Sequence, residues 1–191
     1  MHKLLIYGAG EFGQVIKNLV QCCGYEFSGF IDDYFQGEKI IGTYDSVKSQ
    51  SYFKEHGIVI AVGYKSLENR YAIYQKVKAD GYEVPTLIHP QSIVDKSSRI
   101  GQGSIIMAGA IVDYNVKIKD LVVLWNGVVV SHDSVIGENT FLSPNATVCG
   151  FASIGKDCFI GASAVVTDHL KVPDKSFMKA GSVNELQKRH L

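Results

Sequence analysis

The chain has 191 residues, enough for one large domain or two small ones, and its 46% hydrophobic and 20% charged residues are ordinary for a globular protein. Its 19 basic residues balance its 19 acidic residues, which argues against nucleic acid or an anionic membrane as the main partner. No apolar run is long enough to cross a bilayer and no signal peptide is recognisable, so we expect a cytoplasmic protein.

Residues 1–90 alternate strand-like and helix-like segments. Apolar runs predict buried strands over 3–10, 27–33, 58–63 and 84–90, and apolar residues at helical spacing predict helices over 11–23 and 67–81. Strands separated by helices imply a parallel sheet of βαβ units. The sequence therefore predicts a small α/β, Rossmann-like domain over residues 1–90.

A glycine-rich loop lies between the first predicted strand and the first predicted helix. The segment GAGEFG places Gly8, Gly10 and Gly13 in a GxGxxG pattern, and Asp32 and Asp33 end the second strand. This pattern is typical of loops that hold a diphosphate at a helix N-terminus while an acid contacts ribose. We do not expect NAD, because ninety residues supply only one mononucleotide half, whereas a sugar nucleotide has the same diphosphate and ribose. The alternative is that Asp32 and Asp33 only terminate a strand.

The second half of the chain has a period of six residues. Every sixth position from 94 to 172 is Val, Ile or Leu: Val94, Ile100, Ile106, Val112, Ile118, Leu124, Val130, Ile136, Leu142, Val148, Ile154, Ile160, Val166 and Val172. Small residues stand mostly two positions before each aliphatic, and glycine, asparagine and aspartate are frequent three positions after it. Those three residue types tolerate the left-handed backbone of a corner.

This period predicts a triangular coil. Residues two apart in a strand face the same way, so the small residue and the aliphatic both point inward before the corner turns the chain. Three sides of six residues make a coil of eighteen, and successive coils stack as parallel strands. We predict a parallel β-helix over 91–175, followed by a C-terminal tail over 176–191.

Histidines and cysteines do not show the spacing of a metal site or a disulfide framework. Cys22 and Cys23 are neighbours, and the chain contains no CxxC motif. We therefore predict no metal and expect the cysteines to be reduced, small apolar residues.

Several segments together resemble a known family. SRIGQG, SVIGEN and ASIGKDCFIGASAVV are typical of hexapeptide-repeat acyltransferases, whose β-helix is left-handed. The GxGxxG start, FIDD, IAVG, LIHP and an internal His-Asp pair resemble one subgroup across almost the whole chain. That subgroup contains bacterial nucleotide-amino-sugar N-acetyltransferases and sialic acid O-acetyltransferases. The resemblance implies a homotrimer that uses acetyl-CoA, with the active site at a subunit interface.

His132 and Asp133 are the candidate catalytic residues. Counting from the inward Val130 places both at a corner, where side chains face solvent or a neighbouring subunit. The resemblance implies that His132 is the general base, and an adjacent carboxylate can orient an imidazole for that role. The alternative is a surface pair in which Asp133 only supplies the geometry of the corner.

Small residues suggest where acetyl-CoA binds. Gly150 lies one coil beyond His132, and Gly161 and Ala162 follow it, so we expect one shallow groove beside His132 for the pantetheine arm. The resemblance assigns backbone contacts with the cofactor to Gly150, Ala162 and Ala180. The Gly150 N–H is a candidate donor to the thioester oxygen. The alternative is that small residues merely suit tight coils.

For the acceptor, the resemblance implies a nucleotide site near Gly8, Gly10, Gly13, Asp32, Asp33 and Gly63. One departure concerns Trp125, which stands where several relatives have an asparagine, with Asn126 beside it. Another is the C-terminal MKAGSV, which lacks a proline common in such acyltransferases. Arg70 is interpreted as a surface or helix-packing residue outside the site.

The expected function is acetyl-CoA-dependent N-acetylation of a UDP-, dTDP- or GDP-linked 4-amino-4,6-dideoxy sugar for bacterial surface glycans or glycoproteins. One alternative is O-acetylation of sialic acid or a related sugar. A second is a non-catalytic trimeric scaffold, since β-helices also serve that purpose.

Overall fold

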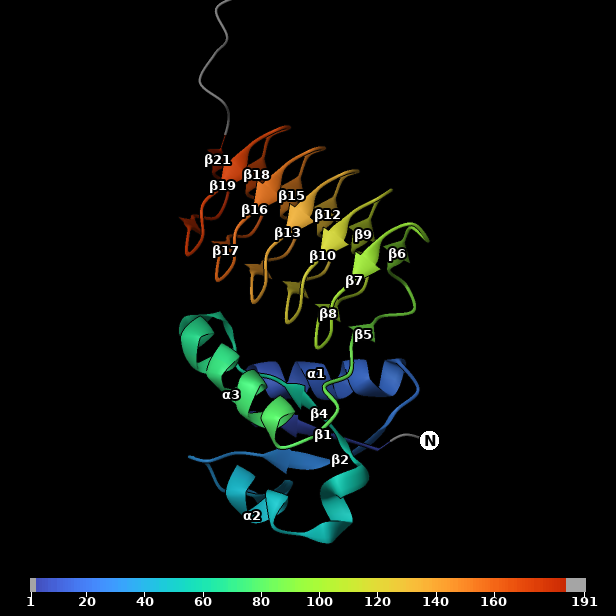
Figure 1. Cartoon of the computed structure of the whole chain (residues 1–191), viewed down its shortest axis with the longest axis vertical. Coiled ribbons are helices and arrows are strands. Elements are labelled where there is room, and N and C mark those ends of the chain that lie inside the picture. Colours follow the sequence, from blue (N-terminus) through green and yellow to red (C-terminus); the bar gives the residue numbers. More distant parts are fainter. Residues whose placement is uncertain (1–2, 185–191) are drawn as a thin grey trace, which may run out of the picture. The chain divides into compact units, whose positions relative to one another are not determined.

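The computed structural model describes residues 3–184 and separates into two compact units, Met1–Leu87 and Ile88–Leu191 (Figure 1). Over the described residues, no helix combines the length and the apolar character that a membrane crossing requires. The same residues contain no group of three or more His, Cys, Asp or Glu side chains placed to hold a metal ion.

The first unit is built on a four-stranded parallel sheet with strand order β3-β2-β1-β4. Its strands are β1 (Lys3–Tyr7), β2 (Glu26–Ile31), β3 (Ile40–Gly42) and β4 (Gly57–Ile60). The α-helices are α1 (Glu11–Cys22), α2 (Tyr44–Lys48) and α3 (Leu67–Ala79), and the 3-10 helices are η1 (Ser51–Glu55) and η2 (Tyr64–Ser66). Figure 1 shows α1 and α2 on opposite sides of the sheet.

The predicted amphipathic helix α1 and the apolar strands β1, β2 and β4 are present in this unit. Helix α1 buries Ile16, Leu19 and Val20, which recur at helical spacing. Helix α3 ends just before Gly81, whose φ of 86° is the left-handed conformation that stops a helix. The α/β prediction for the first unit is therefore confirmed.

The last strand predicted for this sheet is wrong. Within 84–90 only Leu87–Ile88 forms a strand, β5, and it lies in a sheet of the second unit. Pro85 and Pro90 leave little room for a longer strand, because proline has no N–H to donate. The fourth strand is β3, a short segment ending in Gly42 that carries no strand-like pattern.

The second unit is a parallel β-solenoid of two-residue strands, which Figure 1 shows as stacked columns. Three sheets form its faces. The β12 face contains β6 (Ile93–Val94), β9 (Ile111–Val112), β12 (Val129–Val130), β15 (Thr147–Val148), β18 (Val165–Val166) and β21 (Val183–Asn184). The β13 face contains β7 (Arg99–Ile100), β10 (Lys117–Ile118), β13 (Val135–Ile136), β16 (Ser153–Ile154) and β19 (Lys171–Val172). The β14 face contains β5, β8 (Ile105–Ile106), β11 (Val123–Leu124), β14 (Phe141–Leu142), β17 (Phe159–Ile160) and β20 (Phe177–Met178).

The six-residue period is confirmed strand by strand. Each predicted aliphatic is the second residue of a strand, and strands pair in parallel with those eighteen residues away, as Val130 does with Val112 and Val148. Most of these aliphatics form one buried core. The coils continue through Asn184, past the boundary predicted after residue 175.

Every sixth residue from 103 to 181 has a positive φ, so the predicted corners are also present. Glycine, asparagine and aspartate occupy many of them, as expected. Residues of other types occupy the remaining corners: Leu121, Phe151, Ser163, His169 and Lys175. A left-handed conformation costs such residues about 1–2 kcal/mol each, so the stacked coils hold the backbone there against local preference.

The outward strand positions differ between faces. On the β12 face they are almost all aliphatic, and we call this set the apolar row: Ile93, Ile111, Val129, Thr147, Val165 and Val183. On the β13 face the corresponding positions are mostly basic or polar: Arg99, Lys117, Val135, Ser153 and Lys171. Ile93 and Val183 at the two ends of the row are 63% and 59% exposed.

Candidate active site

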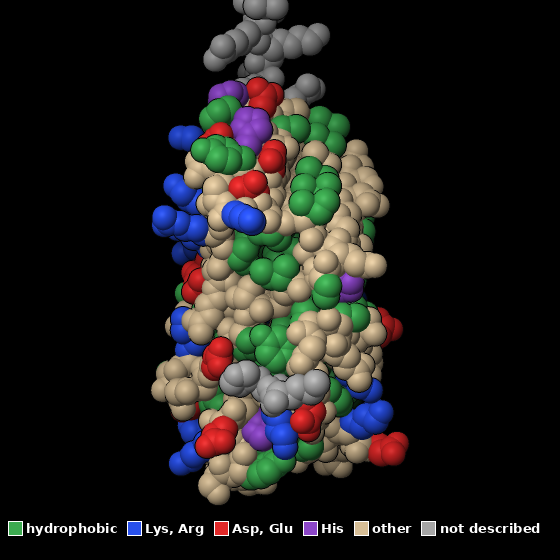
Figure 2. Space-filling view, turned by 90° about the vertical axis from the view of Figure 1, so that its right-hand side faces the viewer, with side chains coloured by type: hydrophobic (Ala, Val, Ile, Leu, Met, Phe, Trp, Pro, Cys, Tyr) green, Lys and Arg blue, Asp and Glu red, His purple; other side chains and the backbone are tan. Residues whose placement is uncertain are grey.

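His132 lies at the corner that joins the β12 face to the β13 face. The backbone turns at Asp133, whose φ is 57° and whose N–H donates to the carbonyl of Tyr114 one coil earlier, at 3.0 Å. The His132 side chain is 47% exposed. Figure 2 shows histidine and acidic side chains side by side on the surface near the C-terminal end of the solenoid. Because its side chain is half exposed, the His132 imidazole can be reached by a ligand or by a neighbouring subunit.

Asp133 contacts His132 directly. His132 Nδ1 and Asp133 Oδ2 are 3.1 Å apart, and Asp133 Oδ1 accepts a hydrogen bond from Asn115 Nδ2 at 2.7 Å. The Asn115 bond, followed by the His132 contact, lowers the pKa of Asp133 below its ordinary value. Asp133 is therefore an ionised acceptor at neutral pH. Asn115 was not among the predicted site residues, although it lies eighteen residues before Asp133.

Gly150 lies directly against the imidazole in the next coil. A Cβ at Gly150 would lie 2.8 Å from both Cε1 and Nε2 of His132, so only glycine fits beneath the ring in this position. Phe151 closes another side, with its ring centroid 5.1 Å from that of His132 and the planes nearly perpendicular at 88°. His169 stacks on Phe151 in turn at 4.9 Å.

The single groove expected around Gly150, Gly161 and Ala162 is not present within one chain. Gly161 follows β17 and Ala180 lies after β20, so these residues and Ala162 occupy the corner between the β14 and β12 faces. Gly150 and His132 lie at the opposite edge of the β12 face. The physical reason is the period: each corner recurs every eighteen residues, whereas Gly150 and Gly161 are about half a coil apart and therefore lie at different corners. A Cβ at Gly161 would also lie 2.5 Å from Ala180 N, so tight coil stacking alone requires that glycine.

In the first unit, the glycine loop has two kinds of glycine. Gly8 has φ of 112°, and a Cβ there would lie 2.6 Å from Ala61 O; a Cβ at Gly13 would strike the carbonyl of Gly8. These two glycines are required by the packing of the loop. Gly10 and Gly63 instead face open space, since a Cβ at either would meet no atom within 4 Å. They leave backbone that a ligand can approach closely.

Asp32 ties the glycine loop to the end of β2. Its Oδ2 accepts the N–H of Ala9 at 2.9 Å, and its Oδ1 accepts the N–H groups of Tyr34 and Phe35, both at 3.0 Å. Burial raises the pKa of Asp32, but the three backbone bonds together outweigh it and leave the pKa below its ordinary value. This carboxylate has a structural task in addition to any contact with ribose.

Asp33 is also engaged within the unit. One oxygen accepts the hydroxyl hydrogen of Tyr7 and the other accepts the N–H of Tyr44 at 2.8 Å. Burial, followed by the bond to Asp33, raises the pKa of Tyr7, which therefore remains a neutral donor. The rings of Tyr7 and Tyr44 stack with their centroids 5.5 Å apart, so the two residues that donate hydrogen bonds to Asp33 also pack against each other.

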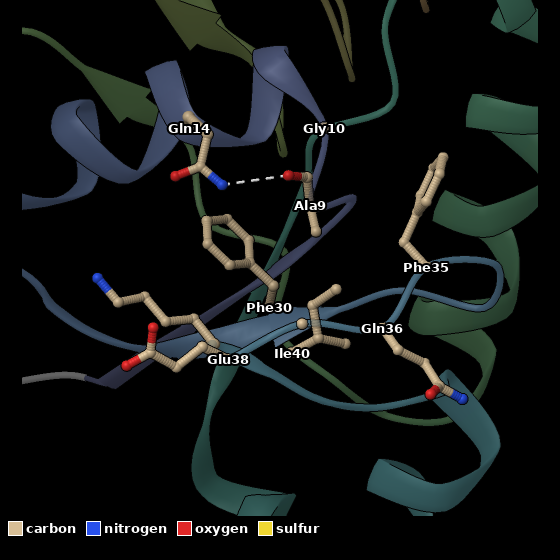
Figure 3. A pocket seen from close by; sticks show the side chains of 10 residues that line it. Ala9, Gly10, Gln14, Phe30, Phe35, Gln36, Glu38 and Ile40 are labelled. Atoms are coloured by element: carbon tan, nitrogen blue, oxygen red, sulfur yellow. Dashed lines mark hydrogen bonds between the residues drawn. The ribbon is translucent and has the colours of Figure 1, made fainter.

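A cavity of about 430 Å³ opens beside the glycine loop (Figure 3). Its lining comprises Ala9, Gly10, Gln14, Phe30, Phe35, Gln36, Gly37, Glu38, Lys39 and Ile40. The Phe30 ring points toward Ala9 and Gln14, and Gln14 Nε2 donates to Ala9 O at 3.1 Å. Of the predicted nucleotide residues only Gly10 lines this cavity, which lies between the start of α1 and the segment that joins β2 to β3.

The remaining sequence-selected residues have plain positions. Trp125 is partly buried against the solenoid core, and its ring centroid lies 6.3 Å from that of Phe141. Asn126 is exposed. Arg70 on α3 is fully buried, and this burial lowers its pKa to about 9. Of the two positions expected for Arg70, at the surface or in helix packing, its burial on α3 agrees with the second.

Comparison with known proteins decides the family. The PglD N-terminal domain matches residues 3–77, and the bacterial transferase hexapeptide (six repeats) family matches 133–168. The acetyltransferase domain of PglB from Neisseria gonorrhoeae FA1090 is 31% identical with a TM-score of 0.91, over 100% of this chain and 94% of that one. The chain belongs to the PglD-type hexapeptide-repeat acetyltransferases.

Two further structures were solved with ligands. The PglB domain in complex with acetyl coenzyme A is 30% identical, with a TM-score of 0.80 over 95% of both chains. PerB from Caulobacter crescentus, in complex with CoA and GDP-perosamine, is 25% identical, with a TM-score of 0.88 over 97% of this chain and 89% of that one. Membership in the PglD-type family makes this chain an acetyltransferase and sets aside the scaffold interpretation.

Proposed function

We propose that the protein transfers an acetyl group from acetyl-CoA to the amine of a nucleotide-linked amino-deoxy sugar, with His132 as general base. The observation that carries this proposal is the exposed imidazole against Gly150, with Asp133 bonded at Nδ1. An amino sugar is favoured over sialic acid because PerB, a relative of the whole chain, was solved with CoA and GDP-perosamine.

The geometry suits acyl transfer to an amine. An ionised Asp133 accepts a hydrogen bond from Nδ1–H, which keeps the proton on Nδ1 and leaves Nε2 with a free lone pair. As the amine nitrogen bonds to the thioester carbonyl carbon, Nε2 takes a proton from that nitrogen. When the C–S bond breaks, the departing sulfur leaves as thiolate and receives a proton from the imidazolium. Histidine is suited to both steps because its unperturbed pKa is near neutral.

The acceptor nucleotide is proposed to bind at the glycine loop. The open backbone at Gly10 and Gly63 and the N-terminus of α1 provide N–H groups that suit a diphosphate. We propose that Gly8 and Gly13 allow the loop to pack closely and do not themselves contact the nucleotide. Asp32 and Asp33 remain candidate contacts for ribose, in addition to the bonds that they already make.

A homotrimer is proposed to complete the site. The apolar row leaves aliphatic side chains on the outward side of the β12 face, and a second copy of this chain would bury them. In a closed ring, one edge of this face meets the opposite edge on the neighbour. The His132 corner of one chain would then adjoin the corner with Gly161, Ala162 and Ala180 of the next. This arrangement would restore the acetyl-CoA groove that one chain lacks.

The test is acetyl transfer by the purified protein, followed as thiol release. UDP-, dTDP- and GDP-linked 4-amino sugars, and sialic acid, are supplied separately with acetyl-CoA. We expect release only with an amino sugar, and a loss of about 10²-fold or more in kcat for His132→Asn with the fold intact. Release only with sialic acid would replace the proposed substrate, and undiminished kcat in His132→Asn would remove the base.

A further inference from the structure

A line of side-chain contacts crosses three coils at the His132 corner. Ser97 Oγ accepts the backbone N–H of Asn115 at 2.8 Å, Asn115 Nδ2 donates to Asp133 Oδ1 at 2.7 Å, and Asp133 Oδ2 lies 3.1 Å from His132 Nδ1. Ser97 is held by Asp95, whose Oδ1 accepts both its N–H and its hydroxyl. The imidazole is thus connected to backbone two coils away.

Asp133 needs an external constraint if it is to orient the imidazole. The terminal torsion of an aspartate is broad, so the carboxylate plane is not fixed by the backbone turn alone. The His132–Asp133 pair is also exposed to water, and an exposed pair has little preference for one geometry. Asn115 supplies the constraint, because it binds the carboxylate oxygen that His132 does not use.

The orientation of the Asn115 amide follows from charge. An ionised carboxylate only accepts hydrogen bonds, so the amide nitrogen rather than the oxygen must face Asp133. This charge-assisted bond is the leading cause of the lowered pKa of Asp133. Other ionisable groups at this corner are His132 itself and Lys117, which lowers the pKa of Asp133 further.

A contact of the same geometry occurs at a corner without a histidine, where Asn139 is buried whereas Asn115 is exposed. Asn139 Nδ2 donates to Asp157 Oδ1, also at 2.7 Å and also across eighteen residues, with positive φ at both residues. Such a bond therefore stabilises a corner by itself. A role for Asn115 in the reaction has to be separated from that general effect, and the Asn139 contact provides the control.

We propose that Asn115 is a positioning residue for acetyl transfer, holding the Asp133 carboxylate so that His132 keeps its proton on Nδ1 and its free lone pair on Nε2. This inference rests on the proposed role of His132. Asn115 touches neither substrate nor the reacting atoms, and acts only through Asp133.

The test compares Asn115→Gly with Asn139→Gly in the full-length protein. Glycine removes the amide without strain, since Gly103, Gly109 and Gly127 occupy equivalent left-handed corners. We expect Asn115→Gly to lower kcat about 10-fold, with KM for both substrates unchanged. The ¹⁵N resonances of His132 should move from the Nδ1–H form toward a mixture of tautomers. Asn139→Gly should lower the melting temperature but change neither kcat nor the His132 resonances.

The outcomes separate this inference from the proposed function. If His132→Asn is inactive while Asn115→Gly keeps wild-type kcat and His132 resonances, the positioning role is wrong and the base assignment stands. If His132→Asn is fully active, both fall. Should Asn115→Gly fail to fold, Asn115→Asp carries the test, because it is nearly isosteric and places a second carboxylate against Asp133. It should lower kcat at neutral pH, and wild-type kcat in this variant would overturn the inference.

Discussion

The imidazole of His132 and the α-carbon of Gly150, one coil apart, lie so close that a methyl group at position 150 would come within 2.8 Å of Nε2. Gly150 is not among the residues with positive φ, so its backbone conformation does not require glycine. The requirement comes from the ring above it. A substitution at this position therefore reports on the placement of the His132 ring, the proposed base, rather than on backbone strain.

Replacing Gly150 by alanine should displace the His132 ring and lower kcat by about 10- to 100-fold, because a shift of about 1 Å in a reacting group can have effects of that size. The melting temperature and oligomeric state should be close to those of the wild type. Steady-state kinetics with both substrates would check this. Wild-type kcat in a folded Gly150→Ala protein would show that the ring can occupy another position without loss.

Charge in the apolar row should disrupt the proposed trimer. Val165→Glu places a carboxylate within the proposed subunit contact, and burying an unpaired charge is costly. We expect smaller particles by sedimentation or light scattering, together with a loss of acetyl transfer. Lys171→Glu is the control, because it changes the outward position of the adjacent strand in the same coil, on the β13 face. Equal behaviour of the two variants would contradict this choice of interface.

Asp32→Asn should loosen the glycine loop. The amide offers one acceptor oxygen where the carboxylate offers two, and its NH₂ would face backbone N–H groups that need an acceptor. We expect a loss of about 1–3 kcal/mol in the free energy of unfolding and a higher KM for the proposed nucleotide-sugar substrate. KM for acetyl-CoA should not change. An unaltered KM for the nucleotide sugar would show that the Asp32 bonds are not needed for substrate binding.

The ionisation of Asp32 should also make the stability of the folded protein depend on pH in the acid range. Its pKa is lower in the folded protein than in the unfolded chain, so its contribution is present above a pH of about 4 and is lost as the pH falls through the folded pKa. Unfolding measurements from pH 6 down to pH 3 should show a smaller loss of stability for Asp32→Asn than for the wild type. Parallel curves would contradict this assignment.

His56 predicts a second pH dependence, in the first unit. Burial, assisted by Lys3, lowers the pKa of His56, while Glu26 and Glu55 act in the opposite sense. The unfolded chain therefore binds this proton more readily, so stability falls as the pH drops through about 6.5 toward the folded pKa. His56→Phe keeps a ring beside Tyr52 and Phe53. Its melting temperature should fall less than that of the wild type between pH 7 and pH 5, and an equal fall would exclude His56 as the cause.

Much of the fold could be predicted because its signals are local and repeated. An aliphatic residue at every sixth position predicts both where each strand lies and which of its side chains points into the core, as at Val130 and Val148. Phe151 and Leu121 carried no such signal, since bulky residues rarely adopt positive φ, and only neighbouring coils hold them there. Strand β3 was missed because Ile40–Gly42 is short and ends in glycine.

The candidate site was predicted less completely, because its contacts follow the coil period rather than the chain. Adjacency in sequence pointed to His132 and Asp133, and a step of eighteen pointed to Gly150. The same step applied to Asp133 leads to Asn115 and Phe151, and it also shows that Gly161 lies elsewhere. The carboxylate bonds of Asp32 and Asp33 have no sequence signature, because they depend on how a loop folds back on itself.

Uniform sides also restrict how such a chain can change in length. An insertion of six or twelve residues would keep every aliphatic inside, yet it would rotate everything downstream onto a different wall of the prism and separate His132 from its partners on earlier turns. Only whole turns of eighteen preserve the vertical alignment of Asn115, Asp133 and Phe151. Relatives of different length should therefore differ by whole turns, because only such changes keep the corner residues of the site aligned.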